Sequence, residues 1–249
     1  MKVILVAAGV GVLTLVQLNA QTAAPKAPAQ TNAAAVSTNL PPPVAGKTNK
    51  VDIKELMEGE SFTNETGMVM VKVSGIWAGK FEVTQEEYQK VTGSNPSQFH
   101  GDKNPVDSVS YDDALAFCGQ LNEAERKEKM LPEGYTYTLP TQGQWESLMD
   151  GATLKDAVTS QGGAKGGTSP VGSLGANSLN LHDTRGNVWE WCLDPTDKPF
   201  RVLRGGAWDT SLEVNLRPEF RWYSKGTDDR QNNYGFRCIL MRGAAPGAN

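Results

Sequence analysis

The sequence predicts an α+β fold with an antiparallel sheet, few helices and many loops. Segments with helical periodicity and capping signals come early in the domain, whereas segments with strand composition dominate its last part. The chain of 249 residues also carries 26 glycines and 14 prolines, which favours short elements joined by loops. No internal repeat of fixed period is present in the sequence, so a solenoid or repeat array is not predicted.

The domain is predicted to open with a hairpin and to continue into capped helices. Met68–Val73 has strand composition, and Phe81–Val83 alternates after a turn at Ala78-Gly79-Lys80. Three helix starts are then marked: by a capping box at Thr84 with Glu87, by an N-terminal signal at Ser110 with Asp113, and by a cap at Thr141 with Gln144. The predicted helices run over Gln85–Val91, from Tyr111 to about Lys129, and from the Thr141 cap through Met149.

The remaining strands are separated by a long loop. The predicted strands are Tyr135–Leu139, the segment around Trp189, Val202–Trp208 and Tyr234–Ile239. Residues 151–178 are rich in Gly, Ser, Thr and Ala and show no sustained period, so we predict a loop that is functional or partly disordered, and favour disorder.

The two ends of the chain differ from the domain in composition. Residues 1–20 combine a charged start, an apolar run and a small residue at the end, which predicts a secretory signal peptide. Residues 21–50 are Ala, Pro and Thr-rich and predict a flexible linker, followed by a domain over 51–242 and a flexible tail over 243–249. We therefore expect a secreted or periplasmic protein with no transmembrane segment in the mature chain.

Charge and cysteine content narrow the possible partners and the redox chemistry. The formal net charge is −4, and no run of basic residues alternates with aromatics, so nucleic acid is not an expected partner. Three cysteines, Cys118, Cys192 and Cys238, in a chain sent to an oxidising compartment predict one disulfide and one remaining thiol.

A turn that leads into a tryptophan-bearing strand is the most distinctive segment, from Asp183 to Trp191. If the turn curls, the carboxylates of Asp183 and Glu190 and nearby backbone carbonyls can converge on a hard cation, calcium before magnesium. The alternative is that Asp183 caps the turn and Glu190 is solvated. From spacing alone, this second interpretation is favoured.

Six sequence blocks, in order and with suitable gaps, resemble the formylglycine-generating enzyme family, also called sulfatase-modifying factors. The blocks are Phe81–Thr84, Asn104–Val106 with Val109–Tyr111, Leu139–Thr141 with Trp145-Glu146, Gly186–Trp191, Arg204–Gly206 and Gly235–Arg237. The resemblance covers about Gly67 to Ile239 and implies a variant of the C-type lectin-like fold.

The resemblance also implies which chemistry is missing. Catalytic relatives oxidise a sulfatase cysteine to formylglycine with oxygen and copper held by two cysteines, because thiolates suit Cu(I). The corresponding positions here are Thr210 and Asn215. We therefore expect no copper site and no formylglycine-generating oxidase activity.

Further site residues follow from the resemblance. It implies a disulfide between Cys118 and Cys238, with Cys192 as a buried thiol. It also favours one calcium ion at the Asp183 turn. The implied ligands are the side chains of Asp183 and Glu190 and the carbonyls of Gly186 and Val188.

In this fold the substrate cleft lies beside the Arg-Gly-Gly segment and the irregular stretch before the last strand. Aromatic and charged residues there suit a glycan or an extended peptide. The candidate ligand-binding residues are Trp208, Asp209, Arg217, Arg221, Trp222, Tyr223 and Arg230. Trp208 is expected to be the most buried of them.

We therefore predict a ligand- or protein-binding module that acts outside the cytoplasm on an unknown protein, peptide or glycan. The first alternative is an enzyme of the same family, either for sulfatase maturation or with an unrecognised activity in the same cleft. The second is an accessory structural component of a cell-envelope complex.

Overall fold

The computed structural model describes residues 57–193 and 200–243, which belong to one compact unit, Asn49–Asn249. The predicted signal peptide, the linker and residues 244–249 lie outside the described residues. Within the described ranges, none of the helices has the length and apolar character needed to cross a membrane.

The elements of the fold are β1 (Ser61–Thr63), β2 (Val69–Val73), β3 (Ile76–Gly79), α2 (Gln85–Thr92), α3 (Tyr111–Lys127), β4 (Tyr135–Thr138), α4 (Gln142–Leu148), η1 (Leu154–Asp156), β5 (Trp189–Cys192), β6 (Val202–Arg204), η2 (Glu213–Leu216), β7 (Trp222–Tyr223), β8 (Tyr234–Gly235) and β9 (Ile239–Arg242).

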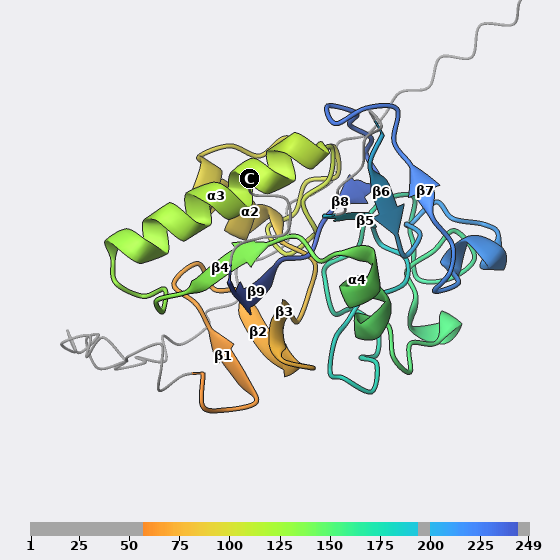
Figure 1. Cartoon of the computed structure of the whole chain (residues 1–249). Coiled ribbons are helices and arrows are strands. Elements are labelled where there is room, and N and C mark those ends of the chain that lie inside the picture. The colour runs from red at the N-terminus through yellow and green to blue at the C-terminus, as the bar shows by residue number, and fades with distance from the viewer. Residues whose placement is uncertain (1–56, 194–199, 244–249) are drawn as a thin grey trace, which may run out of the picture. The chain divides into compact units, whose positions relative to one another are not determined.

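The strands form two sheets, and the α+β prediction is confirmed. The first sheet has the order β1-β2-β3-β9-β4 and is antiparallel throughout. The second has the order β7-β6-β5-β8, in which only the short β5–β8 pair is parallel. The two sheets lie at opposite ends of the domain in Figure 1, with α3 across the first.

The opening hairpin exists, but its turn lies earlier than predicted. The second strand is β3, which pairs with β2, whereas Phe81–Val83 forms no strand. Ser74 and Gly75 both have positive φ, 46° and 85°. Two such residues match the twist of a two-residue hairpin, so the Ser-Gly pair makes the turn and Ala78-Gly79 belongs to the strand.

All three predicted helices are present with their capping boxes. Thr84, Ser110 and Thr141 each accept a hydrogen bond from the backbone N–H three residues on, and the side chain at that position returns one. α3 ends at Lys127, two residues before the predicted end. Its buried stripe includes Phe117 and Leu121, which pack in the main core with Tyr88 of α2.

The predicted strands Val202–Trp208 and Tyr234–Ile239 are each interrupted. β6 ends at Arg204 because Gly205 and Gly206 have positive φ, 96° and 81°. The last segment divides into β8 and β9, which belong to different sheets. Arg237 therefore lies where the chain crosses from the second sheet to the first.

The long loop of residues 151–178 is folded onto the domain, which corrects the prediction of disorder. Val158 forms a bridge with Gly186, and Gly172 donates its backbone N–H to the Asp183 carboxylate at 2.7 Å. Ser169 exchanges hydrogen bonds with the side chain of Asn187. Backbone and side-chain hydrogen bonds thus attach the loop to the Asp183 turn, and Ala157 and Val158 are buried.

Candidate functional site

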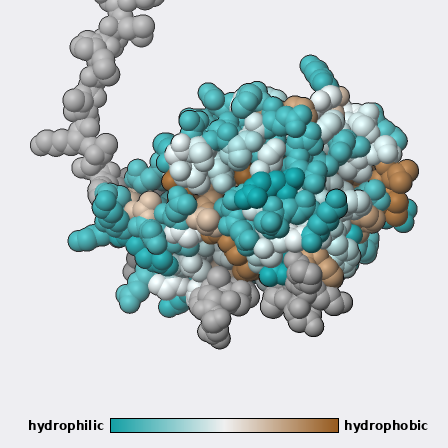
Figure 2. Space-filling view, turned by 90° about the horizontal axis from the view of Figure 1, so that it is seen from above, coloured by the Kyte–Doolittle hydropathy of each residue, from teal (hydrophilic) through white to brown (hydrophobic). Residues whose placement is uncertain are grey.

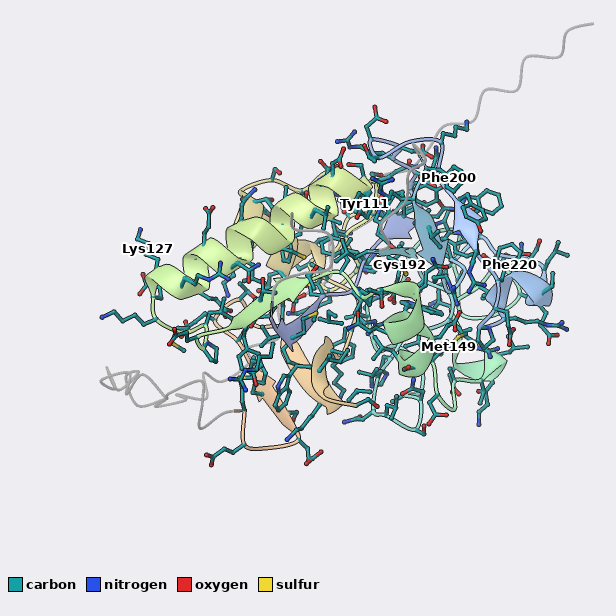
Figure 3. All side chains as sticks on the ribbon, in the orientation of Figure 1. Tyr111, Lys127, Met149, Cys192, Phe200 and Phe220 are labelled. Carbon is teal, nitrogen blue, oxygen red and sulfur yellow. The ribbon has the colours of Figure 1, made fainter. Side chains whose placement is uncertain are left out.

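Strand β5 separates two regions of different character. Its side chains alternate, as expected for a strand. Trp189 and Trp191 belong to the main core, whereas Glu190 contacts Trp145 of α4 and Arg237. Cys192, on the same face as Glu190, packs with Trp145 and Met149, and Figure 3 shows both labelled residues near α4.

The first region is a buried group of four charged side chains, Glu82, Asp183, Glu190 and Arg237, which we call the charged centre. Each is at most 4% exposed. The Arg237 guanidinium donates to Glu190 Oε1 at 2.7 Å, and Trp145 Nε1 donates to Glu190 Oε2 at 2.8 Å. Glu82 accepts from Asn187 Nδ2 at 2.7 Å and from the Val188 backbone N–H at 3.0 Å.

The charged centre holds three carboxyl groups and one guanidinium, and the pKa values of Glu82, Asp183 and Arg237 are shifted from their ordinary values. Burial, with the nearby Asp183 and Glu190 carboxylates, raises the pKa of Glu82 well above its ordinary value. Burial also raises the pKa of Asp183. For Arg237, burial opposes the charge, but the carboxylates of Glu190, Glu82 and Asp183 together outweigh burial and raise the pKa. The centre therefore favours the protonated form of Glu82 and Asp183.

The predicted calcium ligands occupy this centre, and they fit an ion only in part. Asp183 Oδ1 is buried without a hydrogen-bond partner, as expected for an atom that could take a cation. Glu190, however, would have to share its oxygens with Arg237. No three His, Cys, Asp or Glu side chains in the described ranges are grouped so as to hold a metal ion, so Gly186 and Val188 carbonyls would be needed. Calcium binding stays a prediction.

The second region is a cavity of about 490 Å³ beside β5, η2 and β7, which we call the aromatic cavity. Its walls include Trp189, Trp222, Tyr223 and Tyr234. Trp222 and Tyr223 are 43% and 52% exposed, which is unusual for large aromatic side chains. Leu212, also in the wall, is 60% exposed.

The exposed indole of Trp222 is held in place by its neighbours. Its ring stacks on Trp189 with a centroid distance of 6.0 Å, and Trp189 packs in turn on Phe220 at 5.9 Å. Trp222 Nε1 donates to the Tyr234 hydroxyl at 2.7 Å. Phe220 lies beside β7 in Figure 3. A ring fixed in this way loses little conformational entropy when a ligand packs on it.

Three of the seven predicted ligand-binding residues, Asp209, Trp222 and Tyr223, line the aromatic cavity. Trp208 follows β6 and is half-buried against Phe99, with Nε1 donating to the Asn232 carbonyl. It is more buried than Trp222 or Tyr223, as predicted, although it does not lie in a strand.

The three predicted arginines are not in the cavity wall. Arg221 pairs with Glu146 of α4 at 3.0 Å, and Arg230 makes two hydrogen bonds to Asp113 of α3. Arg217 is exposed just after η2. Arg221 and Arg230 therefore connect surface segments to helices, which corrects the expectation that they face the cleft together with Trp222.

Thr210 and Asn215, the positions that resemblance assigns to the copper-binding cysteines, both line the aromatic cavity. The Thr210 hydroxyl accepts from the Ala207 backbone N–H at 2.9 Å, so it also stabilises the turn after Gly206. All three cysteines belong to the described residues, and none lines this cavity. The wall offers hydroxyl and amide groups in place of thiolates.

The cysteines occupy two separate places in the core. Cys118 Sγ and Cys238 Sγ lie 3.6 Å apart, in contact and longer than a covalent S–S bond. The disulfide between them stays a prediction, which this proximity favours. Cys192 is buried, as the resemblance implies.

Sequence reasoning missed Glu82 and Arg237, although both lie in blocks that carry the resemblance. The signal was available: each is a charged residue between apolar neighbours in a short segment, Phe81-Glu82-Val83 and Phe236-Arg237-Cys238. Such charges are buried only when they are paired. Nothing comparable in the sequence indicates that Leu212 and Asn233 line the cavity, as they do in the structure.

The chain matches a family model and several known proteins. A family model described as a sulfatase-modifying factor enzyme 1-like domain matches residues 45–242. The chain is 27% identical to a chaperone protein, LppX, of Paenibacillus barcinonensis, covering 68% of this chain and 83% of that one. It is 30% identical to the inactive C-alpha-formylglycine-generating enzyme 2 of Bos taurus, covering 57% of this chain and 52% of that one.

Among solved structures, Treponema denticola variable protein 1 matches with a TM-score of 0.62 at 22% identity, covering 74% of this chain and 99% of that one. PvdO from Pseudomonas aeruginosa matches with a TM-score of 0.59 at 19% identity, covering 74% and 98%. These two likenesses concern the fold. The family match spans most of the chain, including both sheets, the charged centre and the aromatic cavity, and the chain therefore belongs to the sulfatase-modifying factor enzyme 1-like domain family.

Proposed function

We propose that this chain is a secreted or periplasmic binding module that takes peptide segments of other proteins in the aromatic cavity. The observation that carries the proposal is the exposure of Trp222 and Tyr223 in the cavity lined by Thr210 and Asn215. The wall thus combines apolar contact area with neutral hydrogen-bonding groups at the positions that the resemblance assigns to the copper-binding cysteines.

The chemistry of the wall favours a peptide over a glycan. Leu212, in the same wall as the two aromatic side chains, is 60% exposed. Branched aliphatic side chains suit apolar peptide side chains, whereas glycan sites depend mainly on rings and polar groups. The relative from Paenibacillus barcinonensis is named a chaperone protein, a name that accords with a protein ligand.

The proposal includes the loss of copper oxidase chemistry. A threonine hydroxyl and an asparagine amide are hard, neutral donors that do not replace two thiolates for Cu(I). The test incubates the purified mature chain with copper, oxygen and a sulfatase peptide, and mass spectrometry measures formylglycine. Product formed by this chain alone would show that the enzyme alternative is correct.

Binding is tested by screening immobilised peptides and envelope glycans with the purified mature chain, followed by calorimetry with the best ligand. Truncation of a central aromatic side chain typically costs about 2 kcal/mol or more of binding free energy. We therefore expect Trp222→Ala to raise the Kd about 30-fold. His100→Ala, which removes an exposed ring outside the cavity wall, is the matched control.

Circular dichroism establishes that each variant is folded before its affinity is read. Equal affinity of Trp222→Ala and the unmodified chain would exclude the cavity as the binding surface. If the chain binds glycans and no peptides in the screen, the ligand is a glycan and the proposal of a peptide ligand is wrong. Fractionation of the host cell tests the proposed location.

A further inference from the structure

The charged residues near the end of α3 differ in their surroundings. Glu123, Arg126 and Lys127 are exposed, in keeping with the mostly hydrophilic surface that Figure 2 shows from above. Glu125 lies between them in sequence but is only 3% exposed, and it is the one acid among the buried residues of this helix. Glu125 belongs neither to the charged centre nor to the wall of the aromatic cavity. It is therefore a buried ionisable group that the proposed function does not use.

The Glu125 carboxyl lies near β4 and near the turn between β1 and β2, Asn64–Met68, which we call the β1–β2 turn. Within this group, Asn64 Nδ2 donates to the Tyr137 hydroxyl at 3.4 Å. The two groups lower the pKa of Glu125 in part, but both of its carboxylate oxygens are buried without a hydrogen-bond partner. Buried polar atoms normally have partners, so the carboxyl is poorly satisfied in this arrangement.

The surroundings of Glu125 also disfavour its negative charge. Burial, together with the Glu65 carboxylate of the β1–β2 turn, raises the pKa of Glu125 to about 7. Burial raises the pKa of the Tyr137 hydroxyl and of the Cys238 thiol, which acts on Tyr137, so both groups stay neutral. Within the described ranges, no cation is among the groups that shift the pKa of Glu125. An ionised Glu125 is therefore a buried charge without a partner, which is costly.

Of the two segments that face Glu125, β4 is fixed on α3 and the β1–β2 turn is held more weakly. Asn122 of α3 exchanges two hydrogen bonds with the backbone of Tyr137, at 2.9 and 2.8 Å. The turn contacts its neighbours through the 3.4 Å bond of Asn64 and through Lys90 of α2, an exposed side chain that donates to the Thr66 carbonyl at 3.1 Å. It also follows β1, a strand of three residues at the edge of the first sheet. The turn is therefore the segment that can move away from Glu125.

We propose that Glu125 is a pH-sensitive switch that controls the docking of the β1–β2 turn. When the carboxyl is protonated, the turn packs against it and shields it from water. When the carboxyl is ionised, the turn moves away, and water supplies the hydrogen bonds that the carboxylate lacks. This inference does not depend on the proposed peptide-binding function.

The pH range of the switch is set by the two states of the carboxyl. In the open state the carboxyl is solvated and has its ordinary pKa, near 4.5, whereas in the closed state its pKa is about 7. A group with a raised pKa in the closed state stabilises that state fully below the lower value, and this contribution is lost as the pH rises through the higher one. Opening of the turn therefore becomes more frequent between about pH 4.5 and pH 7, and it changes little above pH 7.

The experiment measures amide hydrogen exchange of the mature chain by NMR between pH 5 and pH 8, corrected for the intrinsic effect of pH on exchange. The backbone amides of Thr66 and Met68 both donate to Asn64 Oδ1, so they report on the turn. Their protection factors are expected to fall at least about tenfold from pH 5 to pH 7 and to stay constant above it. Low concentrations of urea should leave their exchange unchanged and accelerate that of Trp191 in β5, because local opening exposes little surface.

Three variants test the role of the carboxyl. Glu125→Gln cannot ionise, so the protection of the turn is expected to lose its pH dependence and to stay high at pH 8. Glu123→Gln, at an exposed position of the same helix, is the matched control and should keep the pH dependence. Lys90→Met removes the other contact of the turn and is expected to lower its protection by the same factor at pH 5 and pH 8.

The switch is wrong if the protection of the turn does not change between pH 5 and pH 7, or if the change persists in Glu125→Gln. It is also wrong if the exchange of Thr66 and Met68 depends on urea as strongly as that of Trp191, because the turn then opens only when the whole domain unfolds. None of these outcomes affects the proposed binding in the aromatic cavity.

Discussion

The charged centre and the aromatic cavity lie on the two sides of one strand, β5, and they differ in how far their side chains are exposed to solvent. In the charged centre, Glu190 accepts hydrogen bonds from Arg237 and Trp145, and all four charged groups are buried. In the aromatic cavity, Trp222 and Tyr223 remain exposed. The comparison indicates that the charged centre stabilises the fold, whereas the cavity has contact area left for a ligand.

The same contrast holds between neighbouring residues. Arg221 and Trp222 are adjacent in sequence, yet the arginine is engaged by Glu146 and Gln142 of α4 while the indole faces the cavity. A charged residue near a cleft is therefore a weaker indication of ligand contact than an aromatic side chain that remains exposed.

The largest expected effect is on the charged centre. Arg237→Met removes the one cation among three buried carboxyl groups, and breaking a buried pair in this way costs about 3–5 kcal/mol of stability. The loss should be smaller at acidic pH, because the carboxyl groups can then protonate. Urea unfolding at two pH values measures this. A loss below about 1 kcal/mol at neutral pH would show that the centre does not stabilise the fold.

The predicted disulfide gives the next largest effect. Cys118 and Cys238 are 120 positions apart, so a bond between them closes a long loop in the unfolded chain. Such bonds typically contribute about 2–4 kcal/mol. Reduction of the mature chain should lower the free energy of unfolding by this amount, and peptide mapping should find the Cys118–Cys238 bridge. A bridge that includes Cys192 would contradict the assignment.

Calcium provides a test of the imbalance of charge in the centre. An ion that binds only the folded state at about 100 times its Kd adds about 2.7 kcal/mol of stability. We expect a chelator to lower the melting temperature and Asp183→Asn to remove this response, because Asp183 Oδ1 is the carboxylate oxygen without a partner. If the chelator leaves the melting temperature unchanged, the negative charge of the three carboxyl groups is balanced by Arg237 and bound protons alone.

A separate buried acid, Glu125 on α3, predicts a pH dependence of stability. Burial raises the pKa of its carboxyl to about 7. A raised pKa means that ionisation of the Glu125 carboxyl opposes folding. The contribution of the protonated carboxyl to the stability of the folded chain is therefore complete below the unfolded pKa, near 4.5. It is lost as the pH rises through about 7.

Glu125→Gln should therefore stabilise the chain by about 2 kcal/mol at pH values above 7 and have little effect at acidic pH. Chemical unfolding across this pH range measures the difference. Glu123→Gln, on an exposed position of the same helix, is the control. Equal effects of the two substitutions would show that the burial of Glu125 is not responsible.

The smallest expected effect concerns Arg230, which pairs with Asp113 near the start of α3. Because the pair is partly exposed, Arg230→Ala should cost about 0.5 kcal/mol of stability. It should leave peptide affinity unchanged, since Arg230 is not in the wall of the aromatic cavity. A tenfold loss of affinity in a folded variant would restore Arg230 as a ligand-binding residue.

Local signals were sufficient for much of the fold. The capping boxes at Thr84, Ser110 and Thr141 each begin a helix, because cap hydrogen bonds form between residues close in sequence. The folded state of the 151–178 loop could not be predicted in this way. It depends on hydrogen bonds to Asp183 and Asn187, which are distant in sequence.

The candidate site shows the same limit. The resemblance brought Thr210, Asn215, Trp222 and Tyr223 to one region, and the structure places all four in one cavity wall. It could not predict that Arg221 and Arg230 turn to carboxylates of α4 and α3. Composition near a cleft does not determine which charges find partners within the chain.

The central claim is tested most directly by comparing Trp222→Ala with Arg221→Ala in a calorimetric titration with one selected peptide. The account predicts that the Kd of the tryptophan variant rises about 30-fold, while that of the arginine variant stays within about twofold of the unmodified chain. Equal losses from the two substitutions, or a loss confined to Arg221→Ala, would contradict it.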